Sequence, residues 1–167
     1  MSWKIRKLRI FNSTAYYIPD VFSEDVRNIL LSTVKPLLQK VEKEGRLYPG
    51  LSSPSNLQEY DGIFVKYHQT FADIISQLLN INVSFEKSWA TYTPGDVVAF
   101  HTHPVKHVLV YYLKNPDNEG TVYRDGNSVI QTPGDENSAI LFAGNLLHTA
   151  PFSYVEMERY SMALNVM

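Results

Sequence analysis

Three histidines in the C-terminal half are the residues of this chain best suited to chemistry. His101 and His103 stand one residue apart, so on an extended strand both imidazoles project to the same face. His148 follows from a distant segment and can supply a third nitrogen. A single histidine is usually a surface residue or a hydrogen-bonded core residue, but this grouping favours a metal site. Neutral imidazole suits iron, zinc, copper or nickel, so the pattern does not name the metal.

Arg159 is the second residue with chemical potential. It opens a segment in which Arg159, Ser161 and Asn165 share one face of an extended strand. An arginine that points into a β-sandwich is costly unless it meets an anion, and its planar fork can grip a carboxylate with two hydrogen bonds. Pairing with Glu156 or Glu158 at the rim of the sandwich is the simpler alternative, and it stays open at this point.

These side chains must be positioned by strands, because the pattern from Val83 onward is one of short apolar runs separated by turns. Proline, glycine, asparagine and aspartate mark the turns. The expected strands are Ser84–Thr93, Val97–His103, Val108–Lys114, Thr121–Arg124, Ser128–Gln131, Ala139–Ala143, His148–Ala150 and Arg159–Val166.

The N-terminal half is expected to be helical after an initial strand, Ile5–Phe11. Ser23 is a plausible N-cap, and apolar residues then recur at helical spacing as far as Val41, with a kink or break at Pro36. A second helix is expected over Phe64–Leu79. Each helix has an apolar face that needs a partner surface.

The fold class predicted from this order is mostly β with flanking helices. We expect a double-stranded β-helix, or jelly roll, backed by N-terminal helices. The 167 residues fit one domain, in which 1–82 form the strand and supporting helices and 83–167 form the jelly-roll core that carries the site. The loops Gly45–Asp61 and Asp117–Gly126 are candidate walls of a substrate pocket.

Composition excludes several kinds of partner. Fifteen basic and seventeen acidic residues leave a formal charge of -2, so we expect no nucleic-acid partner and no attraction to an anionic membrane. No apolar run has the length of a membrane span or signal peptide. The absence of cysteine restricts metal ligands to histidine, carboxylate or carbonyl groups and suits a reducing cytoplasm, where we expect the protein to be located. A homodimer is compatible with the sequence.

Five segments in this order resemble the Fe(II)- and 2-oxoglutarate-dependent oxygenase superfamily. The resemblance covers residues 84–167, is closest to the small oxygenases of bacteria and phages, and extends more distantly to prolyl hydroxylases. The segments that carry it are Trp89–Asp96, His101–Pro104, Val108–Leu113, Ile140–His148 and Arg159–Ser161.

The resemblance implies a metal site and a co-substrate site. In this superfamily an H-x-D/E pair and a distal histidine hold Fe(II), and an arginine roughly ten residues further on binds the far carboxylate of 2-oxoglutarate. Carried over, His101, His103 and His148 are the metal ligands. Arg159, eleven residues after His148, anchors 2-oxoglutarate with Ser161 as its companion.

The implied activity is the hydroxylation of a small-molecule or peptide substrate, with release of succinate and CO2. Tyr92, Tyr112 and Asn165 are further candidates for contact with 2-oxoglutarate. His103 departs from the superfamily pattern, because it stands where a carboxylate is expected, and it makes the ligand set neutral. His107 is a candidate to orient a metal ligand or, more simply, an exposed residue.

Two other interpretations stay open. A cupin-type three-histidine metalloenzyme would share the jelly roll, and Gly95, His101 and His103 fit the start of its first motif, but it assigns no task to Arg159. A non-catalytic jelly-roll binding module with a structural ion would need a fourth ligand, and His107 is the candidate for it. Arg159 with Ser161 distinguishes the oxygenase from both.

Overall fold

The computed structural model describes all residues except 1–2, 44–45, 48–49, 96–97 and 153–155. The two long helices are α1 (Glu24–Val34) and α2 (Ile63–Leu79). Two short 3₁₀ helices occupy Lys35–Leu37 and Leu57–Glu59. The strands are β1 (Arg6–Ile10), β2 (Ser13–Ile18), β3 (Glu42–Lys43), β4 (Arg46–Leu47), β5 (Leu51–Ser52), β6 (Phe85–Tyr92), β7 (His107–Lys114), β8 (Glu119–Asp125), β9 (Ser128–Pro133), β10 (Ser138–Ala143), β11 (His148–Thr149) and β12 (Tyr160–Val166).

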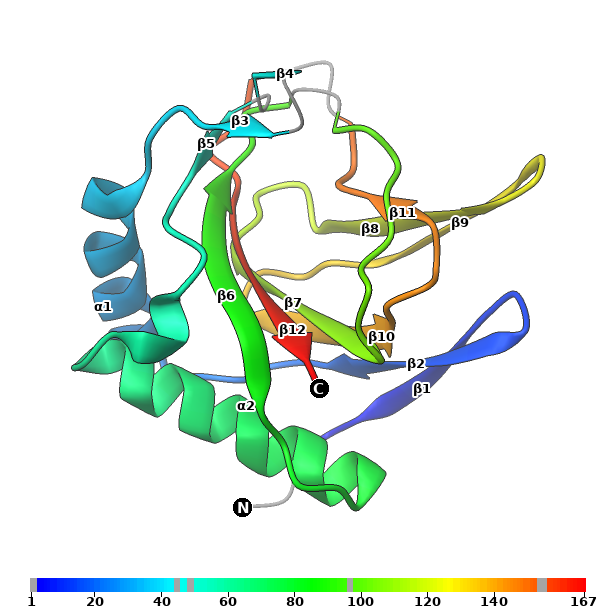
Figure 1. Ribbon diagram of the computed structural model, residues 1–167, viewed down its shortest axis with the longest axis horizontal. Coiled ribbons are helices and arrows are strands. Elements are labelled where there is room, and N and C mark those ends of the chain that lie inside the picture. Colours follow the sequence, from blue (N-terminus) through cyan, green and yellow to red (C-terminus); the bar gives the residue numbers. More distant parts are fainter. Residues whose placement is uncertain (1–2, 44–45, 48–49, 96–97, 153–155) are drawn as a thin grey trace.

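Two antiparallel sheets face each other and form the body of the molecule (Figure 1). The larger sheet has seven strands in the order β1-β2-β10-β7-β12-β6-β5, and the smaller has three in the order β11-β8-β9. An isolated bridge between His101 and His148 adds the segment before β7 to the edge of the smaller sheet. Strands that are distant in sequence thus alternate between the sheets, which confirms the predicted jelly roll.

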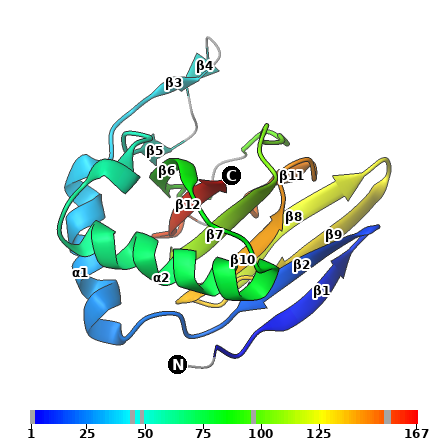
Figure 2. The same ribbon diagram turned by 60° about the horizontal axis from the view of Figure 1, so that its bottom comes forward.

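Both helices cover the outer face of the larger sheet (Figure 2). Ser23 caps α1 by accepting a hydrogen bond from the amide of Val26, and Glu24 and Asp25 lie in the positive first turn. The apolar faces of the helices then pack on the sheet in one buried cluster, with Leu30 and Phe71 among its helical members. The predicted helical backing of the sheet is confirmed. No helix in the described ranges combines the length and apolarity that a membrane crossing requires.

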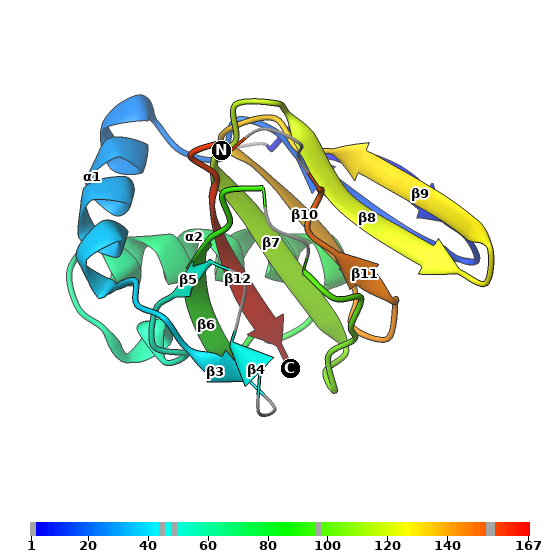
Figure 3. The same cartoon turned by 90° about the horizontal axis from the view of Figure 1, so that it is seen from above.

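A second buried cluster lies between the two sheets, on the inner face of the larger one. Alternation along each strand sends residues to the two sides in turn. On β12, Met162 and Leu164 enter the helix-side core, whereas Ser161 and Ala163 face the space between the sheets. Figure 3 shows β7 and β12 facing this space from one side and β8 from the other. The space between the sheets is therefore bordered by an apolar cluster and, next to it, by small and polar residues such as Ser161 and Ala163.

Three details differ from the sequence prediction. The expected strand Val97–His103 is reduced to the bridge at His101; its first residue lies outside the described ones, and positions 98–100 have no regular structure. The helical run does break at Pro36 as predicted, where α1 gives way to the 3₁₀ turn Lys35–Leu37, but it does not resume toward Val41. β2 and the short strand β5 had no prediction, although β2 joins β1 to β10 and β5 forms the opposite edge of the larger sheet.

Candidate metal centre and adjoining cavity

The rings of His101, His103 and His148 converge. One ligand nitrogen from each lies within 4.8 Å of the others, and they form a cluster that could hold a metal ion. The ring centroids are 4.5 Å apart for His101 and His148, and 5.2 Å apart for His103 and His148. His148 is buried, His103 is half-buried and His101 is exposed, so the cluster reaches from the interior toward solvent.

Backbone hydrogen bonds fix the two chain segments that carry the rings. The amides of His101 and His148 donate to each other's carbonyl oxygens at 2.9 and 3.0 Å. The amide of His103 donates to the carbonyl of Gly144 at 2.8 Å, and the amide of Gly144 donates to the carbonyl of Lys106 at 3.0 Å. The rings are therefore positioned by main-chain pairing of two segments that are distant in sequence.

The imidazoles are suited to bind a cation through their outer nitrogens. Nδ1 of His101 lies 2.9 Å from the carbonyl oxygen of Ala99, and Nδ1 of His148 lies 2.7 Å from that of Leu146. A carbonyl can only accept, so both Nδ1 atoms carry the proton and each Nε2 keeps a lone pair. Burial lowers the pKa of His148 to about 3, with the neighbouring His101 and His103 adding to the effect, so this ligand is neutral at physiological pH.

A cavity of about 90 Å³ extends from the three histidines into the space between the sheets. Residues from both sheets line it. Besides the histidines, its walls are formed by Trp89, Thr91, Thr93, Val98, Val108, Val110, Tyr112, Thr121, Thr149, Ala150, Pro151, Arg159, Ser161 and Ala163. The three histidines and Arg159 thus line one cavity.

Arg159 lies just before β12 and is 3% exposed. Its Nε donates to Oδ1 of Asn115 at 3.0 Å, and one terminal nitrogen donates to the carbonyl of Pro151 at 2.8 Å. The other terminal nitrogen forms an ion pair with the carboxylate of Asp117. The rim pairing considered from the sequence does not occur with Glu158, which instead pairs with Lys114 on the surface. Arg159 is an inward arginine held by several protein groups.

Small polar groups surround the same part of the cavity. The hydroxyls of Ser161 and Thr91 lie 2.9 Å apart across neighbouring strands. The Tyr112 hydroxyl lies 2.7 Å from that of Thr121 and accepts a hydrogen bond from the Thr121 amide. Thr93 is 2% exposed, and its hydroxyl has no hydrogen-bond partner among the described residues. A buried hydroxyl without a partner is costly, so this wall has unused capacity to bind a polar ligand.

Two residues predicted from the sequence lie away from this cavity. Tyr92 is adjacent in sequence to Thr91 and therefore points to the opposite face of β6, where its ring lies 4.9 Å from that of Tyr160. Asn165 shares the inward face of β12 but lies four residues beyond Ser161, or about 13 Å along the strand. Its amide nitrogen donates to Glu86 at 3.1 Å. The structure does not bring either residue to the site.

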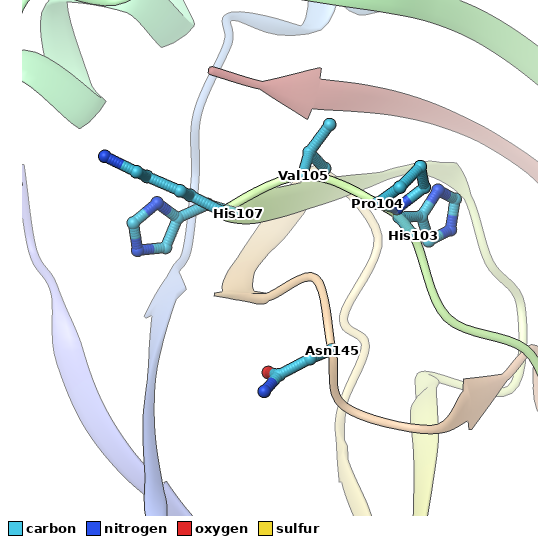
Figure 4. A pocket seen from close by; sticks show the side chains of 6 residues that line it. His103, Pro104, Val105, His107 and Asn145 are labelled. Atoms are coloured by element: carbon cyan, nitrogen blue, oxygen red, sulfur yellow. The ribbon is translucent and has the colours of Figure 1, made fainter.

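A wide surface hollow of about 650 Å³ lies next to the histidine cluster (Figure 4). It is lined by His103, Pro104, Val105, Lys106, His107 and Asn145. His103 borders both the hollow and the inner cavity, so the two spaces meet at a candidate metal ligand. His107 is half-buried in the hollow, and burial followed by the charge of Lys106 lowers its pKa. His107 does not join the cluster of ligand nitrogens.

Sequence reasoning missed the polar partners of Arg159 and several wall residues. Asn115 and Asp117 belong to the turn after β7, and only the fold shows that this turn reaches Arg159. Trp89 and Thr91 could have been found, because the alternation that places Ser161 inward also applies to β6. The Trp89 ring stacks on His103 with centroids 5.7 Å apart.

Comparison with solved structures identifies the architecture. HygX from Streptomyces hygroscopicus, solved with nickel, 2-oxoglutarate and hygromycin B bound, superposes with a TM-score of 0.72 over 91% of this chain and 82% of its own, at 12% identity. A prolyl hydroxylase from Trichoplax adhaerens, in complex with a hypoxia-inducible-factor peptide, gives a TM-score of 0.70 over 92% and 83% of the two chains, at 15% identity. The chain has the fold of the 2-oxoglutarate-dependent oxygenases.

The oxygenase fold is shared with a protein of nearly the same extent. The viral collagen prolyl hydroxylase of Paramecium bursaria Chlorella virus-1, solved as its 2-oxoglutarate complex, matches with a TM-score of 0.65 over 91% of this chain and 94% of its own, at 14% identity. No protein-family model and no curated protein sequence matches the chain. The likeness therefore lies in the oxygenase fold rather than in the sequence.

Proposed function

We propose that this protein is an Fe(II)- and 2-oxoglutarate-dependent oxygenase that hydroxylates a small-molecule or peptide substrate. The observation that carries the proposal is the single cavity lined by His101, His103 and His148 at one end and by buried Arg159 with Ser161 at the other. A cupin-type enzyme or a binding module with a structural ion gives Arg159 no task. Such an arginine suits a co-substrate with a carboxylate.

The donor set fits an iron ion with open positions. The three imidazoles present nitrogens within 4.8 Å of one another, and no fourth histidine or carboxylate of the described residues joins the cluster. A structural zinc site would normally be closed by four protein ligands. These three imidazoles would hold a ferrous ion and leave it positions for a 2-oxo acid and O2, and the ion would supply the oxidising chemistry.

The remaining residues bind and orient the co-substrate. Arg159 would hold the far carboxylate of 2-oxoglutarate, and the hydroxyls of Ser161 and Thr91 stand beside it on adjacent strands. Thr93 offers a buried hydroxyl that has no partner within the described part of the chain. The hydrogen-bonded side chains of Tyr112 and Thr121 complete this polar wall of the cavity. Together they would direct the 2-oxo group toward the histidines and exclude water.

The prime substrate would approach from the surface hollow, because that hollow meets the inner cavity at His103. Lys106, His107 and Asn145 offer hydrogen-bond donors along its walls. The solved neighbours include one complex with hygromycin B and one with a peptide fragment, so proteins of this fold bind a small molecule in one case and a peptide in the other. We assign the whole chain, 1–167, to this function as one domain.

Turnover of the co-substrate tests the proposal. The protein, supplied with Fe(II), 2-oxoglutarate and air, is expected to form succinate slowly without a prime substrate, as followed by proton NMR. His148→Ala removes the buried ligand and serves as the matched control, in which succinate is expected to fall to the level of Fe(II) in buffer. Equal succinate formation in the two proteins would contradict the proposal.

A further inference from the structure

The turn after β7 is built around the guanidinium of Arg159. Asn115 is 1% exposed, and its amide nitrogen donates to the carbonyls of Glu119 and Gly134 while its Oδ1 accepts from Arg159. Two residues on, Asp117 accepts from Arg159 through Oδ2 and from the amide of Glu119 through Oδ1. Both oxygens of Asp117 are thus used, and the carboxylate is fixed against the arginine.

The ion pair with Asp117 balances the positive charge of Arg159 inside the protein. The side chains of Arg159 and Asp117 are 3% and 14% exposed, so the pair is shielded from water. A buried guanidinium without a counter-charge would be strongly destabilising, and Asp117 removes that cost while the cavity holds no anion. The consequence is that the polar end of the cavity has no net charge from this pair.

Arg159 nevertheless keeps donors for a ligand. A guanidinium has five N–H groups, of which Nε has one and each terminal nitrogen has two. The contacts to Asn115, Pro151 and Asp117 use one N–H on each nitrogen. Among contacts between described residues, one N–H on each terminal nitrogen is left, and Arg159 lines the cavity. A ligand carboxylate, with two acceptor oxygens, or a carboxamide, with one, can accept hydrogen bonds from these two N–H groups.

We propose that Asp117 is a specificity-determining residue that reduces the charge selectivity of the co-substrate site. With Asp117 in place, a distal carboxylate brings a second negative charge to one guanidinium. Its attraction to Arg159 is offset in part by its repulsion from Asp117. A neutral carboxamide at the same position loses the attraction but also escapes the repulsion. The site accordingly selects 2-oxo acids by hydrogen bonding and length, and accepts a distal carboxylate or carboxamide.

This inference rests on the proposed function, and 2-oxoglutarate and its 5-(N,N-dimethylamide) test it because they differ only in the distal group. The tertiary amide is used because 2-oxoglutaramate closes to a cyclic lactam that lacks the 2-oxo group. Each is titrated calorimetrically into the Ni(II)-loaded protein, which measures binding without turnover. The wild-type protein is expected to favour the carboxylate by less than about tenfold. Asp117→Asn removes the negative charge and is expected to raise that preference by about tenfold or more, mainly through tighter binding of 2-oxoglutarate.

Glu158→Gln is the matched control. It makes the same change in charge one residue before Arg159, but Glu158 pairs with Lys114 at the surface and does not contact the guanidinium. Its preference is expected to equal that of the wild type. Circular dichroism and Ni(II) affinity verify that each variant keeps the fold and the metal site.

The outcomes separate the two claims. A preference in Asp117→Asn equal to that of the wild type, with both acids bound, would overturn the role of Asp117 and leave the oxygenase proposal intact. If the wild type prefers 2-oxoglutarate to its neutral amide by more than about a hundredfold, the role of Asp117 is likewise overturned. If neither acid binds to the Ni(II)-loaded wild type, the proposed function fails, and the inference fails with it.

Discussion

At the scale of single residues, the ligand set and the arginine pair divide the charge of the site in an unusual way. His103 stands where the resemblance leads one to expect a carboxylate, so the candidate metal cluster consists of three histidines. A carboxylate does lie next to the cavity, where Asp117 forms an ion pair with the cavity-lining Arg159. The negative charge therefore lies beside Arg159, the proposed co-substrate anchor, instead of within the histidine cluster.

Arg159→Ala is expected to destabilise the fold as well as weaken co-substrate binding. The variant leaves Asp117 buried without its counter-ion, and we expect the free energy of unfolding to fall by about 3 kcal/mol. Adding Asp117→Ala is expected to recover part of the loss, because the orphaned charge is then removed. Urea denaturation of the two single variants and the double variant measures the coupling. Strictly additive losses would contradict a buried ion pair.

At the scale of elements, the histidine cluster depends on a close approach of two loops. A Cβ placed on Gly144 would lie 2.2 Å from the carbonyl oxygen of Val105 and 3.0 Å from that of His103. Both neighbours are backbone atoms, so they cannot give way without a shift of the segment that carries His103. The position of His103 therefore depends on the absence of a side chain at Gly144 on the opposite loop.

Gly144→Ala is expected to weaken metal binding although Gly144 is not a ligand. The displaced backbone would move His103, and we expect the affinity for Ni(II) to fall by about tenfold, as for other residues that orient ligands. Calorimetric titration with Ni(II) measures the change. Gly126→Asn, at the tip of the β8–β9 hairpin where nothing lies within 4 Å, is the control. Unchanged Ni(II) affinity in Gly144→Ala would refute the loop requirement.

The contact between α2 and β6 has its own pH dependence. Nδ1 of His68 bonds the carbonyl of Phe64, and Nε2 accepts from the Ser88 hydroxyl. Burial lowers the pKa of His68, although the Phe64 carbonyl opposes this in part. Because its folded pKa lies below the unfolded value, the unfolded chain binds the proton more readily. The stability contributed by neutral His68 is present above about pH 6.5 and is lost as the pH falls.

His68→Gln is accordingly expected to reduce the acid sensitivity of the metal-free protein. The measurement is the thermal midpoint at pH 7.5 and pH 5.5 for both proteins. The drop in thermal midpoint from pH 7.5 to pH 5.5 should be smaller in the variant than in the wild type. It should not vanish, since burial also lowers the pKa values of His107 and His148. If the thermal midpoint falls equally between the two pH values in the variant and the wild type, His68 does not contribute to the acid sensitivity.

At the scale of the whole molecule, the helices and the jelly roll share one core. The cluster on the outer face of the larger sheet contains Leu30 and Phe71 from the N-terminal half and Leu109 and Leu164 from the C-terminal half. Neither half can bury its apolar surface without the other. This arrangement supports the assignment of the chain to a single domain.

Unfolding is therefore expected to be one cooperative transition. Ellipticity at 222 nm follows α1 and α2, and in a Trp3→Phe variant the fluorescence of Trp89 follows β6 in the jelly roll. The two signals should give the same urea midpoint. A helical transition at clearly lower urea than the Trp89 transition would show that the N-terminal half is a separate unit.

Much of this account could be predicted from local patterns, and the part that could not depends on long-range packing. Strand alternation and turn residues predicted most strands, and the spacing of His101 and His103 indicated a shared face. Tyr92 was assigned to the site although one step along β6 turns its ring to the opposite face of the sheet, where it contacts Tyr160. Asp117 was missed because its role arises only when the turn after β7 meets the residue before β12.

The most direct measurement on the central claim is a visible spectrum taken without oxygen. Addition of 2-oxoglutarate to the Fe(II)-loaded protein is expected to produce the charge-transfer band of a 2-oxo acid chelated to iron, and succinate, which lacks the oxo group, is expected to produce none. His148→Ala should give no band. If the wild type also gives no band and binds 2-oxoglutarate no more tightly than succinate, the three histidines and Arg159 do not form an oxygenase site.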